Sequence, residues 1–461
     1  MTRLWIKNPL ASFDGVGAGS ADGGVVVEDG WITQCLAAGE APATPADEIF
    51  DASAHVILPG LINTHHHFYQ TLTRAYREAL DKPLFPWLQA LYPVWAELTE
   101  DMVAAATALA GAELLLSGCT TAVDHHYVFS DRLGHAIDAQ VEAARQIGLR
   151  VVLTRGSMSL GQSAGGLPPD SVVQTESEIL TDSQRLISRY HDRDPGALCQ
   201  IALAPCSPFS VTAPLMRDTA DLARENDVLL HTHLAETHDE TEFCLQQFGK
   251  RPLDYVEDLG WLQDRSWFAH GIHFNEDEIS RLGSANCGVA HCPSSNMILA
   301  SGICPVAALE RAGAIVGLGV DGSASNDSSN LIAEARQSLL IQRLGEARAR
   351  DADALLTSHL DALRWATRGG ANLLRRPELG RLEVGAAADI ALFTLHDLRF
   401  SGAQDPLAAL VLSGAQHADA VMVHGAWRVQ DGALVDVDQA QLVHTHTLLA
   451  QELWKKLASN E

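Results

Sequence analysis

Pairs of histidines and single acidic residues recur in this chain directly after short apolar segments. His65 and His67 follow the apolar residues 58–63, with His66 between them. On an extended segment, residues i and i+2 lie on one side, so both imidazoles can reach the same ion while His66 points away. Neutral imidazoles suit zinc and related ions. By itself the pattern also fits histidines exposed at a strand end, so further donors are needed.

Three later segments supply such donors. His233 ends the apolar residues 228–233, and Glu236 follows it by three positions. His270 closes a second apolar segment, and Asp321 follows the apolar residues 315–320. An acidic side chain in that position is costly to bury unless it is paired or bound to a cation. The pattern therefore favours a metal centre with a carboxylate, Glu236, beside it for proton transfer.

The spacing predicts one divalent metal ion. Zinc is the first choice, and iron is the alternative, because nitrogen and oxygen ligands do not separate the two ions sharply. The ligands we expect are His65, His67, His233 and Asp321.

The elements that must position these side chains follow a regular order. Across residues 59–378, apolar strand-like segments end in polar clusters, and each is followed by a helical stretch. About eight such units predict an α/β fold with a (β/α)₈ (TIM) barrel, whose catalytic groups lie at the carboxyl ends of the strands. Residues 1–58 and 379–461 have short strands and two hairpins, at 24–32 and 429–435. They predict one small β-sandwich domain built from both termini.

Composition narrows the class of protein. The 461 residues are 47% hydrophobic and 20% charged, which is typical of a globular protein with a large core. No apolar run is long enough for a membrane helix, and the first residues lack the pattern of a signal peptide, so we expect a cytoplasmic protein. The net charge of −26 disfavours nucleic acid polymers and anionic membranes as partners and is compatible with a small neutral substrate.

In combination the motifs resemble a known family. They are Pro-Gly-Leu-Ile-Asn-Thr-His-His-His at 59–67, His-Leu-Ala-Glu at 233–236, Ala-His-Gly at 269–271 and Val-Asp-Gly-Ser at 320–323. Over its whole length the chain resembles the amidohydrolase superfamily, in the branch of cytosine, guanine, S-adenosylhomocysteine and triazine deaminases or chlorohydrolases. The segments at 204–208 and 321–327 bring it nearest to deaminases of 8-oxoguanine.

This resemblance implies an aminohydrolase that acts on cyclic amidines, most directly one that converts 8-oxoguanine to urate and ammonia. It implies that Asp321 moves a proton from water to the leaving amine, Glu236 protonates the neighbouring ring nitrogen, and His270 orients the water. It also makes a homo-oligomer the expected assembly. Many relatives bridge two metal ions with a carboxylated lysine, but no lysine occurs between Lys82 and Lys250, or between Lys250 and Lys455. A mononuclear site follows.

Four residues are candidate substrate contacts, each with a plainer alternative. Gln70 resembles the position that binds a ring carbonyl or amide edge in guanine-type deaminases, or it is a solvated glutamine at a helix start. Trp87 and Trp95 either stack on a flat heterocycle or pack in the core. Cys206 stands where deaminases of larger nucleosides carry a histidine, which favours a bare base; the alternative is a buried, inert thiol.

Other functions remain open at this point. A triazine-type aminohydrolase or chlorohydrolase, or a guanine or isocytosine deaminase, would use the same metal site with different pocket walls. A non-catalytic scaffold of the same fold is disfavoured, because such proteins typically lose ligands, whereas this chain keeps the four expected ligands together with Glu236 and His270.

Overall fold

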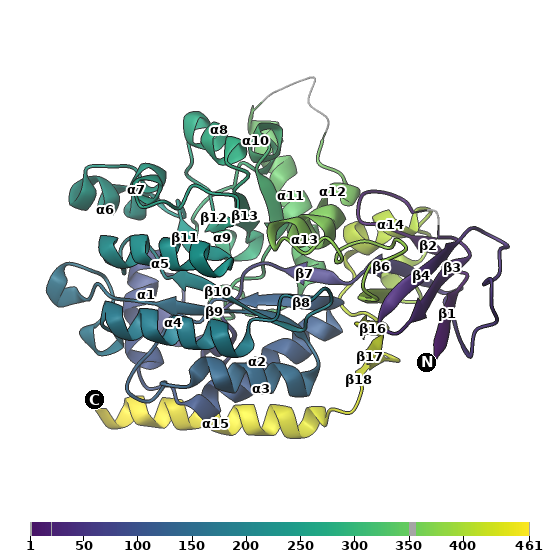
Figure 1. Ribbon diagram of the computed structural model, residues 1–461, viewed down its shortest axis with the longest axis horizontal. Coiled ribbons are helices and arrows are strands. Elements are labelled where there is room, and N and C mark those ends of the chain that lie inside the picture. Colours follow the sequence, from purple (N-terminus) through teal and green to yellow (C-terminus); the bar gives the residue numbers. More distant parts are fainter. Residues whose placement is uncertain (1, 20, 350–355, 461) are drawn as a thin grey trace.

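Eight parallel strands form the centre of the molecule. The computed structural model describes residues 2–19, 21–349 and 356–460 (Figure 1). In the central sheet each strand lies beside the next one in the chain, from β7 to β14. The strands are β7 (Leu61–Asn63), β8 (Cys119–Asp124), β9 (Arg150–Ser157), β10 (Cys199–Pro205), β11 (Leu230–Leu234), β12 (Ser266–His270), β13 (Gly288–His291) and β14 (Ile315–Leu318). The predicted (β/α)₈ barrel is confirmed.

The barrel closes between its first and last strands. The backbone N–H of Thr64 donates to the carbonyl of Leu318 at 2.8 Å. Just beyond this pair, the N–H of Asp321 donates to the carbonyl of His65 at 3.0 Å. Chain segments about 250 residues apart therefore meet at one end of the barrel, and they carry two of the expected ligands.

Helices connect the strands and cover the outside of the barrel. Helix α3 shows how the sequence places them: Ile137, Val141 and Ala144 recur at helical spacing and are buried, and Gly148 ends the helix in a left-handed conformation (φ 76°). The main covering helices are α2 (Glu100–Leu116), α3 (Ala136–Ile147), α4 (Glu176–Tyr190), α5 (Ala213–Asn226), α6 (His238–Phe248), α8 (Glu276–Ser284), α10 (Val306–Ala312) and α11 (Leu331–Ala349). Among the described residues, no helix is both long and apolar enough to cross a membrane.

Two further sheets lie at one side of the barrel and combine both ends of the chain. One has the order β4-β3-β1-β5 and the other β18-β17-β16-β15-β6-β2. Their strands are β1 (Arg3–Lys7), β2 (Ala11–Ser12), β3 (Gly24–Glu28), β4 (Trp31–Leu36), β5 (Glu48–Asp51), β6 (His55–Pro59), β15 (Ile390–Thr394), β16 (Ala420–Val423), β17 (Ala426–Gln430) and β18 (Ala433–Leu434). Both expected hairpins form, as the pairs β3–β4 and β17–β18.

The C-terminal residues leave these sheets. Helix α15 (Gln439–Asn460) runs along the barrel and packs against α2 and the 3₁₀ turn at Phe68–Thr73 (Figure 1). The buried ring of His446 contacts the hydroxyl of Thr71 at 3.0 Å. The domain boundaries at 58 and 379 stay predictions, and α15 is an element from the C-terminal segment that lies on the barrel.

Candidate active site

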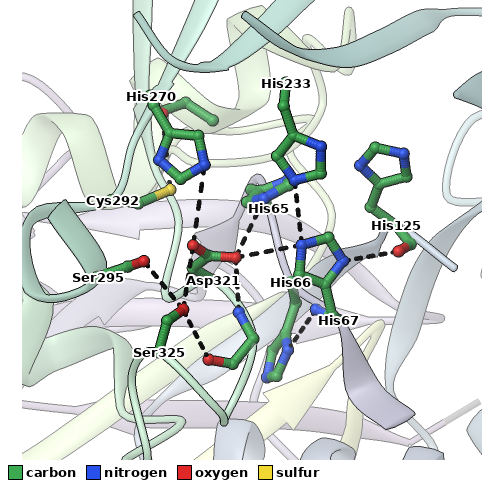
Figure 2. Close-up of polar contacts among 12 residues, drawn as sticks. His65, His66, His67, His125, His233, His270, Cys292, Ser295, Asp321 and Ser325 are labelled. Atoms are coloured by element: carbon green, nitrogen blue, oxygen red, sulfur yellow. Dashed lines mark hydrogen bonds and ion pairs between the residues drawn. The ribbon is translucent and has the colours of Figure 1, made fainter. Parts of the chain in front are cut away.

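The expected site residues meet at the carboxyl ends of the barrel strands (Figure 2). His65 and His67 follow β7, His233 lies in β11, His270 ends β12, and Asp321 follows β14. All five are buried. His270 and Asp321 have left-handed backbone conformations, with φ values of 72° and 63°. Such conformations are strained for residues other than glycine and concentrate at functional sites.

Four side chains converge at short range: His65, His67, His233 and Asp321, the His/Asp cluster. The Nε2 atoms of His65 and His67 each lie 3.2 Å from Asp321 Oδ1. The Nε2 atoms of His67 and His233 are also 3.2 Å apart. His270 is a little further away, with its Nε2 3.8 Å from Asp321 Oδ2.

The hydrogen bonds on the other ring nitrogen assign the tautomer of each histidine. His67 Nδ1–H donates to the carbonyl of His125, and His233 Nδ1–H donates to that of Cys206, both at 2.7 Å. His231 Nδ1–H donates to the carbonyl of Trp267 at 2.9 Å, which leaves His231 Nε2 as the acceptor for His65 Nδ1–H at 2.7 Å. Each cluster imidazole is thereby left with an unprotonated Nε2.

These Nε2 atoms face one another and a carboxylate oxygen, so acceptors oppose acceptors. Such contacts are repulsive unless a cation lies among them. Burial also lowers the pKa of His65 and of His233 well below the ordinary value, which keeps both rings neutral. Three imidazoles and one carboxylate fit a divalent metal ion. Two overlapping groups of buried side chains could hold one, His65, His67, His125 and His233, and His65, His270 and Asp321.

Glu236 and His270 form a second pair beside the cluster. Glu236 Oε2 lies 3.5 Å from His270 Nε2, and the hydroxyl of Ser301 donates to Glu236 Oε1 at 3.4 Å. Burial raises the pKa of Glu236, which favours its protonated form. Burial alone would lower the pKa of His270, but the carboxylates of Glu236 and Asp321 raise it above its ordinary value. The pair can therefore hold and exchange a proton.

The two oxygens of Asp321 have different surroundings. Oδ1 faces the cluster histidines and accepts the N–H of Gly322 at 2.7 Å. Oδ2 faces His270 and accepts the hydroxyl of Ser325 at 3.4 Å, and Ser325 in turn accepts from Ser295 at 2.9 Å. One oxygen is thus directed to the metal site and the other to the proton-handling pair.

A small pocket opens beside these groups and contains three of the four expected substrate contacts, Gln70, Trp87 and Cys206. Trp95 lies outside the lining: it is fully buried behind Trp87, at 5.6 Å between ring centroids, and its indole N–H donates to Thr73. Trp95 therefore packs in the core. The remaining lining residues are His67, Leu84, Leu88, Tyr127, Phe209, His233, Glu236, His270, Leu299, Asp321 and Ser325.

The side chain of Gln70 is held with its donor end free. Its Oε1 accepts the N–H of Ala324 at 3.3 Å and lies over Gly322, where a Cβ atom would meet it at 1.9 Å. Its buried Nε2 has no hydrogen-bond partner among the described residues. Cys206 is also buried, and burial raises the pKa of its thiol to about 12. Gln70 can donate to a bound ligand, whereas Cys206 contributes a neutral surface.

Sequence reasoning missed two histidines of the site. His125 follows β8, stacks on His233 at 4.7 Å, and has a ring nitrogen within 4.8 Å of the ligand atoms of the cluster histidines. Its Nε2–H donates to the carbonyl of Ala204 at 2.9 Å. His231, two residues before His233, orients His65. The available signal was that His125 directly follows the apolar segment of β8, and that His231 lies two residues before the expected ligand His233.

Comparisons with known proteins agree with this geometry. The model of the amidohydrolase family matches residues 56–428. The 8-oxoguanine deaminase of Pseudomonas aeruginosa is 59% identical over 98% of this chain and 99% of its own length. Hydroxydechloroatrazine ethylaminohydrolase of Pseudomonas sp. (strain ADP) is 38% identical over 86% of this chain and 82% of its own. The crystal structure of an atrazine chlorohydrolase from Arthrobacter aurescens TC1 complexed with zinc has a TM-score of 0.90 at 29% identity, and the match covers 97% of this chain and 100% of that one.

This chain belongs to the amidohydrolase family. It is a hydrolase of carbon–nitrogen bonds, of the aminohydrolase kind. Its buried histidines and Asp321 form a site that could hold a metal ion.

Proposed function

We propose that this enzyme deaminates a free purine-type base, with 8-oxoguanine as the preferred substrate and urate and ammonia as products. One observation carries the proposal. The His/Asp cluster, the Glu236–His270 pair and the free donor of Gln70 all lie at one small pocket. The full-length similarity to the 8-oxoguanine deaminase of Pseudomonas aeruginosa supports this choice of base.

We propose a single zinc ion as the cofactor, held by His65, His67, His233 and Asp321. The five lysines of the chain, at positions 7, 82, 250, 455 and 456, all lie outside the barrel strands, so no lysine is available to bridge a second ion. A zinc-complexed structural relative supports the choice of metal. Bound there, the ion supplies Lewis-acid chemistry that makes water acidic enough to be deprotonated near neutral pH.

In the proposed reaction two side chains move protons and a third orients the water. Asp321, through Oδ2, accepts a proton from the attacking water and passes it to the leaving amine. Glu236 donates a proton to the ring nitrogen beside the attacked carbon, in keeping with the raised pKa of its buried carboxyl. His270, fixed by Nδ1–H donation to Asn296 Oδ1 at 2.9 Å, orients the water from its Nε2. Water adds at C2, the C2–NH₂ bond breaks, and ammonia leaves. The C2 hydroxyl then becomes a carbonyl, and its proton returns to Glu236.

The pocket walls support a flat substrate without a sugar. Gln70 Nε2 is a buried donor that a ring carbonyl would satisfy. Trp87, held by donation from its indole N–H to the carbonyl of Ala324 at 3.1 Å, gives an aromatic face for stacking. The neutral thiol of Cys206 and the apolar Leu299 leave no polar partner for ribose hydroxyls on their side of the pocket.

Hydrolysis of a substituted triazine is the second candidate. It is favoured by the similarity to hydroxydechloroatrazine ethylaminohydrolase and to the atrazine chlorohydrolase structure. Both candidates need the same metal site, so the leaving group and the ring distinguish them.

A substrate panel tests the proposal. The purified enzyme with zinc is incubated with 8-oxoguanine, guanine, isocytosine, cytosine, adenine and S-adenosylhomocysteine, and ammonia is measured. Atrazine and an ethylamino-triazine are assayed for chloride and ethylamine. We expect the highest kcat/KM for 8-oxoguanine and no ammonia release from S-adenosylhomocysteine. Higher kcat/KM for a triazine would select the second candidate instead.

We also propose a homo-oligomer that functions in the cytoplasm. Leu340 and Leu344 on α11, and Val443 and Leu448 on α15, are large apolar side chains with about half of their surface exposed. Contact between copies of the chain would cover such side chains. Sedimentation at several protein concentrations tests the assembly, and a monomer at every concentration contradicts it.

A further inference from the structure

Helix α6, which follows Glu236, begins with a cap that differs from those of its neighbours. In α4, Thr175 caps the helix and Glu178 reaches back to the N–H of Thr175 at 3.0 Å, the usual reciprocal arrangement. Helix α6 has the same local sequence pattern, with Thr237 as cap and Glu240 three residues later. There the glutamate reaches further back along the chain.

Glu240 binds the two backbone N–H groups that precede its own cap residue. Its Oε1 accepts the N–H of Ala235 at 3.0 Å, and its Oε2 accepts the N–H of Glu236 at 2.8 Å. Its side chain is buried, and no ion-pair partner for it occurs in the part of the chain that the structure describes. Burial raises the pKa of Glu240 to about 8, against the opposing effect of these two N–H groups. Burying a carboxyl without an ion-pair partner costs free energy, so Glu240 contributes little to stability as an ordinary helix cap.

The segment whose N–H groups bind Glu240 also forms hydrogen bonds with another part of the chain. Ala235 has a left-handed backbone (φ 54°), and its carbonyl accepts the N–H groups of Ile272 and His273, both at 2.9 Å. Because Ile272 and His273 follow His270, these bonds join the end of β11 to the loop after β12. Two backbone hydrogen bonds and one buried carboxyl therefore fix the main chain at Ala235 and Glu236.

Among the described residues, the side chain of Glu236 has only long polar contacts, 3.4 Å to Ser301 and 3.5 Å to His270. Its place in the pocket is consequently set by its backbone. We propose that Glu240 is a positioning residue, which holds the main chain of Glu236 so that the Glu236 carboxyl faces the ring nitrogen of the substrate. The inference rests on the proton-donor role of Glu236 in the proposed function.

A double-mutant cycle tests this inference on the zinc-loaded enzyme with 8-oxoguanine. Glu240→Gln keeps one acceptor oxygen but turns an NH₂ group towards the second N–H. We expect kcat to fall about 10- to 100-fold, as for a small misplacement of a reacting group, with KM changed less than about twofold. Zinc content stays equal to that of the parent. In a Glu236→Gln background, Glu240→Gln should lower kcat no further, because it acts through Glu236.

The matched control is Glu178→Gln, the same substitution at the same helix position in α4, which should leave kcat and KM unchanged. Unchanged kcat in Glu240→Gln, or effects that multiply in the double variant, would overturn the inference. If Glu240→Gln does not fold, Glu240→Asp keeps the carboxyl on a shorter side chain and is expected to show the same loss of kcat; parental kcat overturns the inference. Parental turnover in Glu236→Gln alone would instead reject the proposed role of Glu236.

Discussion

At the scale of single residues, the carboxyl of Glu236 lies among groups with distinct tasks. Asp321 directs Oδ1 towards the cluster histidines and Oδ2 towards His270, and Glu236 meets His270 from the other side. Because Glu236 is not within the His/Asp cluster, its substitution should impair proton transfer and leave metal binding intact. That separation gives the most direct test of the proposed chemistry.

Glu236→Gln is expected to keep the metal and lose turnover. The amide has nearly the same shape but no acidic proton to donate to the ring nitrogen, so kcat should fall about 100-fold or more. Metal content by atomic absorption and steady-state kinetics on the same preparation check this. A variant that loses both metal and turnover would instead assign Glu236 to the metal site.

A buried histidine outside the cluster, His126, is expected to lower the stability of the protein in acid. Burial, then the charge of Arg155, lowers the pKa of His126 to about 3, and neither ring nitrogen has a partner among the described residues. Unfolded, a histidine titrates near pH 6.5. Between about pH 6.5 and 3 the unfolded state therefore binds a proton that the folded state does not, and stability falls as pH is lowered, by about 1.4 kcal/mol per pH unit.

His126→Phe should remove this dependence. Relative to the parent, the variant should gain about 1.4 kcal/mol in free energy of unfolding for each pH unit from 6 to 4, as measured by urea denaturation. The comparison cancels other titrating groups, which are common to both proteins. Parallel stability curves across this range would contradict the depressed pKa of His126.

At the scale of elements, neighbouring strands orient the ligands. His231 on β11 accepts from His65, which follows β7, and donates to the carbonyl of Trp267 on β12. Its ring also stacks on the Trp267 indole, with centroids 4.3 Å apart. One side chain thus connects three strands and fixes the tautomer of a proposed ligand.

His231→Phe should weaken metal binding without loss of packing. Phenylalanine can keep the stack on Trp267 but cannot accept from His65 Nδ1–H, so the orientation of His65 is no longer fixed. We expect the Kd for zinc to rise about 10- to 100-fold, measured by competition with a chromophoric chelator. His191→Phe, at the far end of α4, is the control. Equal Kd values for His231→Phe and parent would show that His65 is oriented by other contacts.

At the scale of the whole molecule, the proposed ligands connect distant strands of one barrel. His65 and His67 follow β7, His233 lies in β11 and Asp321 follows β14. An ion bound to all four holds these strands together in the folded state alone. Metal binding and folding are therefore linked.

Removal of the metal should lower the melting temperature. Free ion at 1,000 times its Kd stabilises the folded state by about 4 kcal/mol. Scanning calorimetry after chelation and dialysis should show a lower Tm, and added zinc should restore it. The same Tm before and after chelation would mean that the barrel closes without help from an ion.

The sequence predicted the elements well because their signals are local. Apolar segments of strand length followed by helical periodicity identified the barrel, and the pattern at 24–32 identified a terminal hairpin.

The sequence predicted Trp87 and Trp95 equally as stacking residues, yet only Trp87 lines the pocket. Burial alone did not distinguish them, since both are buried; what differs is the side of the helix that faces the pocket.

What the sequence alone determined is the order and type of the donors, three imidazoles and a carboxylate after successive strands, and the absence of lysine from those strands. Only the tertiary structure decided that β7 and β14 meet, which brings His65 against Asp321 across about 250 residues. It also decided that His231 contacts His65 and that Glu240 contacts the main chain of Glu236. The reason is physical: residue type and periodicity act over a few positions, whereas barrel closure and buried hydrogen bonds depend on the packing of the whole chain.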